Sequence, residues 1–213
     1  GVARGIEDAG THLSATFAEW VEAVFDHPVG GPGWYWADDF GELWDALALS
    51  DALTVEYLTR LFRTPGCLAA YSLDQVGQAI WFLIGEASPA QPSRVLVESD
   101  VPFEARAACI RAMTDFFRDF VAPAAPGPAD TDEDAFHIAC YMWWDIFPSW
   151  GGPQAGEPAL HDVCLTVMDE ILQLRSELCR LSALHGLNHW YFHHASAVEG
   201  IIDRFLGRTT ALP

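Results

Sequence analysis

Hydrophobic residues recur at helical spacing through most of this chain. Apolar positions at i, i+3, i+4 and i+7 mark an amphipathic helix. Such stretches occupy residues 11–25, 54–63, 72–87, 102–121, 133–147, 160–174, 178–188 and 198–206. The alternating pattern of a strand is nearly absent, and the short apolar run at 94–97 has no second strand to pair with. The pattern therefore predicts an all-α fold, with 94–97 as a helix or connector.

The most apolar predicted helix is the one at 133–147. Hydrophobic side chains cover nearly all of its sides, so none of its faces suits contact with water. Other helices must therefore surround it. We expect Trp143, Trp144 and Phe147 to be among the most buried side chains, with Trp81 near them.

Proline- and glycine-rich segments divide the predicted helices into groups. An N-terminal region, 1–50, contains helices and an aromatic loop, and helix pairs follow at 54–87, 102–147 and 160–206. These groups start roughly 50 to 60 residues apart, whereas HEAT and armadillo repeats are roughly 40 to 47 residues long. We expect residues 1–213 to form a single all-α domain of stacked antiparallel helix pairs.

The C-terminal third resembles a HEAT-like repeat. The stretch Ser-Glu-Leu-Cys-Arg-Leu-Ser-Ala-Leu-His-Gly-Leu at 176–187 has the arginine, alanine, leucine and late glycine of a first repeat helix. The stretch Ala-Val-Glu-Gly-Ile-Ile-Asp-Arg-Phe-Leu at 197–206 is similar to a second repeat helix. The blocks Cys-Tyr-Met-Trp-Trp-Asp and Ser-Ala-Leu-His-Gly-Leu also resemble a bacterial family of uncharacterised function. The resemblance implies a helical-repeat (α-α superhelix) fold and no particular activity.

Charge narrows the range of partners. The chain has 30 acidic and 11 basic residues, all of the latter arginine, and a net charge of −19. Small soluble domains typically carry roughly 2 to 8 net charges. Nucleic acid and anionic membranes are therefore disfavoured partners, because both require a cationic surface. A basic protein partner, or solubility alone, fits this charge.

The lack of targeting signals and the pattern of cysteines favour a cytoplasmic location for the protein. No run approaches the roughly 18 to 20 apolar residues of a membrane span, and no signal-peptide pattern is visible. The 5 cysteines are odd in number and include no C-x-x-C motif. They indicate small buried side chains in a reducing compartment rather than a disulfide or zinc framework.

Familiar catalytic motifs are missing from the sequence. It contains no phosphate-binding loop, no dinucleotide fingerprint, no nucleophile elbow and no H-E-x-x-H motif. The absence of lysine also excludes Schiff-base chemistry. No cofactor is therefore expected, and two weaker candidates for chemistry remain.

The first candidate is a histidine cluster, which consists of His185, His189, His193 and His194. A spacing of four places His185 and His189 on one helical face, where they could hold a divalent metal. The carboxylate ligand would come from another part of the C-terminal third, at Asp162, Glu199 or Asp203. However, Gly186 and the aromatic run after it predict that the helix ends near residue 190. Histidine is also favoured at a helix C-terminus without a metal. From sequence alone, packing or capping is favoured over metal binding.

The second candidate is Asp145, a carboxylate among tryptophans. If buried, its pKa would rise, and it could act as a general acid. A structural hydrogen bond or an arginine pairing is the commoner role for such a residue, and the sequence favours that interpretation.

Aromatic residues in predicted loops form a possible binding surface, namely Trp34, Tyr35, Trp36 and Trp150. Tryptophan combines a large apolar area with one hydrogen-bond donor, which suits contact with a partner. The alternative, favoured here, is that the loop around residues 34–36 folds back over the core.

The sequence thus favours a protein-interaction module over an enzyme. Helical solenoids offer broad grooves, and no catalytic motif is present. The alternative is a metal-dependent, hydrolase-like enzyme that uses the C-terminal histidines.

Overall fold

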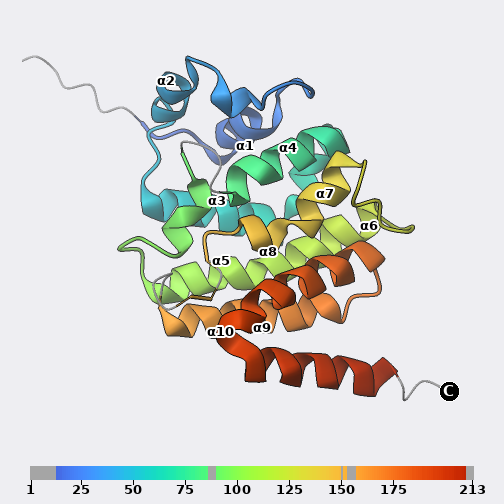
Figure 1. Cartoon of the computed structure of the whole chain (residues 1–213). Helices are drawn as coiled ribbons and strands as arrows, with labels where there is room; N and C mark the ends of the chain where they lie inside the picture. The colour runs from blue at the N-terminus through green and yellow to red at the C-terminus, as the bar shows by residue number, and fades with distance from the viewer. Residues whose placement is uncertain (1–12, 86–89, 150, 153–156, 210–213) are drawn as a thin grey trace, which may run out of the picture.

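The computed structural model describes residues 13–85, 90–149, 151–152 and 157–209, and in these residues the fold is all-α (Figure 1). The α-helices are α1 (Phe17–Phe25), α2 (Phe40–Asp45), α3 (Asp51–Arg63), α4 (Leu73–Ile84), α5 (Phe103–Phe116), α6 (Ala122–Ala124), α7 (Ala135–Tyr141), α8 (Trp143–Ile146), α9 (Pro158–Leu172) and α10 (Glu177–Thr209). Short 3-10 turns are η1 (Trp34–Trp36), η2 (Pro65–Ala70) and η3 (Pro92–Leu96), and η4 (Phe117–Val121) is a π-helical turn that continues α5. The run at 94–97 falls largely in η3, so it is a helical connector as predicted.

Local sequence signals explain where several helices begin. Ser72 and Gln75 form a capping box at the start of α4, as the sequence predicts. The helix expected to begin at Thr54 begins earlier, because the Ser50 hydroxyl accepts a hydrogen bond from the Leu53 amide and caps α3. Thr54 instead donates its hydroxyl hydrogen bond to the Ser50 carbonyl.

The helices from α3 to α10, apart from the short α6, lie in two rows, and α1 and α2 lie above them in the view of Figure 1. In the first row α5 packs between α3 and α9, and in the second row α7 and α8 pack between α4 and α10. The chain alternates between the rows, so α3 and α4 are neighbours in sequence but pack mainly against other helices. The last pair, α9 and α10, does pack closely together. This two-row order is compatible with a helical-repeat fold.

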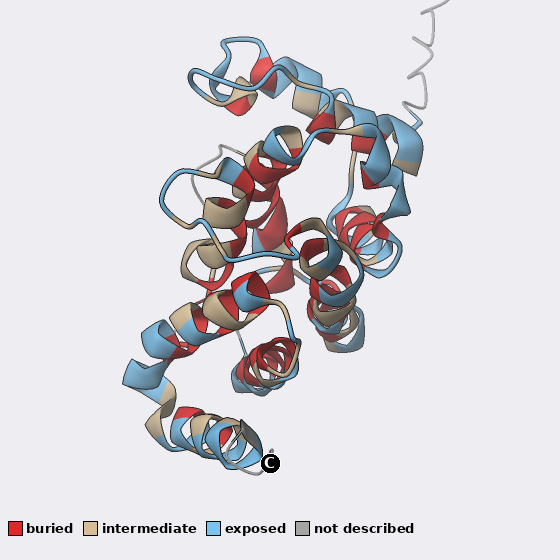
Figure 2. Cartoon of the chain, turned by 90° about the vertical axis from the view of Figure 1, so that its right-hand side faces the viewer, coloured by how far each residue is buried: buried red, intermediate tan, exposed pale blue. Residues whose placement is uncertain are grey.

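The hydrophobic core extends through both rows, and Figure 2 shows the buried parts of the helices facing one another. Trp143, Trp144 and Phe147 have no exposed surface, which confirms the prediction made from the pattern around them. Trp81 is only partly buried and packs against the edge of this core. The predicted helix at 133–147 is interrupted at Met142, whose ψ of −3° separates α7 from α8.

The longest helix, α10, continues past residue 190, where the sequence predicts its end. Its backbone leaves helical geometry at His194, with φ −132° and ψ 38°, and the chain bends there into a second limb. The first limb lies against α7, α8 and α9, and the second limb forms the outer end of the molecule (Figure 1). None of the described helices is both long enough and apolar enough to cross a bilayer.

Candidate metal site

Two neighbouring helices of the second row bring three potential metal ligands together. Asp145 lies on α8, and His185 and His189 lie on the first limb of α10. One ligand atom from each residue lies within 4.8 Å of the other two, and no other histidine, cysteine or carboxylate group of this kind occurs in the described residues. The His189 Nε2 atom is 3.4 Å from Asp145 Oδ1. The two candidates for chemistry predicted from the sequence, Asp145 and the histidine cluster, therefore meet here, through His185 and His189.

A glycine allows the two helices to approach this closely. Gly186 lies beside His185 on α10, and Trp144 lies beside Asp145 on α8. A Cβ atom built on Gly186 would be 2.5 Å from the Trp144 Cβ and 2.9 Å from the Met168 Sδ. Any larger residue at 186 would therefore push α10 away from α8. The absence of a side chain at Gly186 is what places the two histidines beside the carboxylate.

His185 is the enclosed member of the cluster. Its ring stacks on Tyr141 at a centroid distance of 4.1 Å, and its Nε2 atom is buried without a hydrogen-bond partner. Burial lowers the pKa of His185, His189 lowers it further, and the Asp145 carboxylate opposes both effects. A lowered pKa keeps the imidazole neutral, which is the form that binds metal ions. Burial of a polar nitrogen without a hydrogen-bond partner costs free energy, and a bond from this nitrogen to a metal ion would offset that cost.

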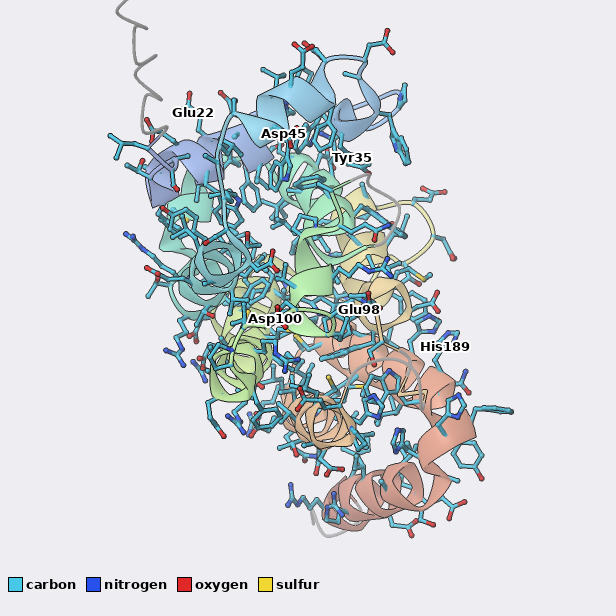
Figure 3. The ribbon with its side chains drawn as sticks, turned by 90° about the vertical axis from the view of Figure 1, so that its left-hand side faces the viewer. Glu22, Tyr35, Asp45, Glu98, Asp100 and His189 are labelled. Atoms are coloured by element: carbon cyan, nitrogen blue, oxygen red, sulfur yellow. The ribbon has the colours of Figure 1, made fainter. Side chains whose placement is uncertain are left out.

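The other two members face outward. The side chains of His189 and Asp145 are 38% and 28% exposed, and Figure 3 shows His189 at the outer face of the molecule. The rings of His185 and His189 lie 4.7 Å apart and nearly perpendicular. Asp145 is therefore not enclosed by the tryptophans, and the burial on which a general-acid role depends is only partial. A ligand held here would be open to solvent on one side.

The remaining histidines of the sequence cluster lie outside this group. His194, at the bend of α10, has its Nε2 atom 2.8 Å from the Gly151 carbonyl oxygen and stacks on Trp190. His193 is exposed and close to Gly152. The three carboxylates that the sequence suggested as ligands are not part of the group either. One of them, Glu199, accepts a hydrogen bond from the Tyr191 hydroxyl.

The aromatic loop divides between core and surface. Trp34 and Tyr35 pack against Phe82 of α4, with ring centroids 4.7 and 5.4 Å away. Trp36 is 55% exposed. Most of the loop thus folds over the core as the sequence favoured, and Trp36 alone of these three presents a large exposed surface. Trp150 lies outside the described residues.

Comparison of this chain with protein-family models, with curated proteins and with solved structures finds no match. Function must therefore be inferred from the site itself.

Proposed function

We propose that this protein binds a divalent transition-metal ion through Asp145, His185 and His189 and acts as a metal-dependent, hydrolase-like enzyme. The observation that carries the proposal is the convergence of these three side chains from two helices, with ligand atoms within 4.8 Å of one another. Sequence alone favoured an interaction module, because helical solenoids offer broad grooves and the chain has no familiar catalytic motif.

The set of donor atoms indicates which metals fit. Two imidazoles and one carboxylate suit zinc and ferrous iron, and both metals use such sets in enzymes. Structural zinc sites usually have four protein ligands, whereas catalytic sites have three and leave a position for water. A metal with an open position activates water and polarises carbonyl or phosphoryl groups. The count of three ligands and the solvent-open side therefore favour catalysis over a structural role.

The surrounding residues prepare the ligands. Stacking on Tyr141 fixes the ring of His185, and the buried helix α8 holds Asp145 in place. Because both histidines lie on the same regular limb of α10, their relative positions change little. Such preorganisation reduces the ordering cost of binding.

Metal content of the purified protein tests the proposal. Untagged protein prepared without chelators should contain about one zinc, iron or manganese ion per chain, measured by elemental analysis. The variants His189→Ala and Asp145→Ala should lose the ion. His193→Ala is the matched control, since His193 lies on the same helix outside the cluster, and it should retain the ion. A metal-free protein that also fails to bind added zinc in calorimetry would refute the proposal.

The hydrolytic part of the proposal needs its own assay. Protein loaded with metal should hydrolyse a model ester or phosphoester, and the rate should fall to background in His189→Ala. A protein that binds metal stoichiometrically but hydrolyses neither substrate class would remain a metal-binding protein without this activity.

A second proposed function is a cytoplasmic, HEAT-like interaction module that binds a basic protein. The two-row order of the helices favours it, because stacked helical repeats present extended surfaces for partners. The net charge of −19 would attract a cationic partner and repel nucleic acid. Pull-down from a native lysate should recover a basic protein in a salt-sensitive manner, and gel-shift assays at physiological salt should detect no nucleic-acid binding. Micromolar affinity for DNA or RNA would contradict this function.

A further inference from the structure

A cavity of about 490 Å³ lies between α3 and the start of α5, and it shares no residue with the candidate metal site. Its size falls within the roughly 300 to 1,000 Å³ of small-molecule sites. Small apolar side chains form most of its wall, among them Ala52, Val55, Ala105 and Ala108. Arg60 and Arg63 of α3 also line it, together with Glu56. The cavity therefore combines an apolar wall with two cationic groups.

The two arginines have no acidic partner among the described residues. In the part of the chain that the structure describes, neither Arg60 nor Arg63 forms an ion pair, although the sequence has 30 acidic residues. Among the other described arginines, ion pairs are formed by Arg94, Arg106, Arg111, Arg118 and Arg204, whereas Arg175, Arg180 and Arg208 also form none. Residues three apart on a helix are neighbours, so Arg60 and Arg63 can approach the same ligand. Because both of these arginines line the same largely apolar cavity, the cavity favours an anionic ligand.

The position of Arg60 supports this inference. Glu56 lies one helical turn before Arg60, at the spacing that favours an ion pair. The Arg60 guanidinium instead lies over the ring of Phe17, 4.1 Å from its centroid. This cation–π contact holds the guanidinium while leaving its N–H groups available. Glu56 adds one negative charge to the cavity wall and therefore disfavours ligands with several negative charges.

We propose that this cavity binds a small monocarboxylate with an apolar body, such as a medium-chain fatty acid or an arylalkanoic acid. The carboxylate would bind Arg60 and Arg63, whose planar guanidinium groups match its geometry. The apolar body would occupy the space between Val55 and the alanines of α5. This inference is independent of the proposed metal chemistry, because the two sites have no residue in common.

Calorimetric titration with octanoate tests the proposal, with octanol and octylamine as neutral and cationic probes of the same length. Octanoate should bind with one site per chain, and the other two probes should bind much more weakly. The double variant Arg60→Gln/Arg63→Gln should weaken octanoate binding by about tenfold or more, since hydrogen bonds to charged groups are strong. The matched control is Arg175→Gln/Arg180→Gln, because it removes the same charge at arginines outside the cavity. It should leave binding unchanged.

A second variant tests the apolar part of the cavity without changing charge. Ala105 is exposed at the cavity wall, so Ala105→Phe should fill the space while the core remains intact. Octanoate binding should then be lost with circular dichroism and melting temperature preserved. Absence of octanoate binding to the parent protein would overturn the proposal. Equal binding of octanol, or equal loss of binding in the control double variant, would overturn it as well.

Discussion

Gly186 of α10 lies so close to Trp144 of α8 that an added Cβ atom would be 2.5 Å from the Trp144 Cβ. Real Cβ atoms do not approach other carbon atoms this closely, so the helices would have to move apart. Asp145 follows Trp144 on α8, and His185 precedes Gly186 on α10. The contact between Gly186 and Trp144 therefore also sets the geometry of the candidate metal site.

Gly186→Ala should therefore destabilise the protein, although alanine ordinarily favours a helix over glycine by about 1 kcal/mol. The expected cost of overpacking is about 1 to 3 kcal/mol, and zinc affinity should fall with it. Thermal melting and zinc titration measure the two effects. Gly200→Ala is the matched control in the second limb of α10, where the added atom would meet only the flexible end of Arg204 at 3.5 Å. A melting temperature for Gly186→Ala at or above that of Gly200→Ala would contradict the argument.

Removal of the ring that stacks on His185 should weaken metal binding. Tyr141→Ala should lower zinc affinity by about tenfold or more, as is typical when a residue that orients a ligand is lost. Tyr141→Phe retains the stacked ring and should bind zinc like the parent. If the two variants bind zinc equally well, the stacking contact at 4.1 Å does not position His185.

Truncation of a buried tryptophan should reduce stability strongly. Trp144 has no exposed surface, so Trp144→Ala should cost about 3 to 5 kcal/mol in the free energy of unfolding. Trp36→Ala removes the same side chain at a position that is 55% exposed and should cost far less. Chemical denaturation of both variants checks this difference. Similar midpoints would show that Trp144 is not a core residue.

Thiol labelling should distinguish one cysteine from the other four. Cys67 is exposed, whereas Cys109, Cys140, Cys164 and Cys179 are buried. Partial desolvation by neighbouring groups raises the pKa of Cys67 above its usual value, and full burial raises that of Cys109 to about 12. The thiolate is the reactive form, so labelling at Cys67 should be slow at neutral pH and accelerate as the pH rises past the usual thiol pKa.

Mass spectrometry of the native protein should therefore find one label per chain, at Cys67, and 5 labels after unfolding. The variant Cys67→Ser should remain unlabelled when folded. Rapid labelling of a second cysteine in the native state would show that part of the core opens readily.

Much of the fold could be predicted from periodicity, because each helix buries one apolar stripe. The break at Met142 could not, since the residues around it are apolar on every side and show no local stop signal. The packing of α3 on α5, rather than on α4, depends on contacts between distant segments. Helical periodicity identifies a buried face but does not identify the helix that covers it.

The site was only partly predictable for the same reason. Spacing identified His185 and His189 as a possible ligand pair, and its position among tryptophans drew attention to Asp145. The sequence suggested carboxylates of the C-terminal third instead, at Asp162, Glu199 or Asp203. Gly186 indicated a helix end, whereas in the structure it permits close helix contact. That difference can be resolved only when the neighbouring helix is known.

The location of the site between α8 and the last pair of helices has a consequence for how the chain unfolds. Asp145 lies on α8, and the histidines lie on α10, which packs with α9 as a terminal pair that has no neighbour on its outer side (Figure 1). In stacked helical arrays such a terminal unit opens most easily, because stability comes mainly from contacts with neighbours. A metal ion bound across the junction would stabilise only conformations in which this terminal unit remains docked. Limited proteolysis of the C-terminal third would then report the metal concentration around the protein.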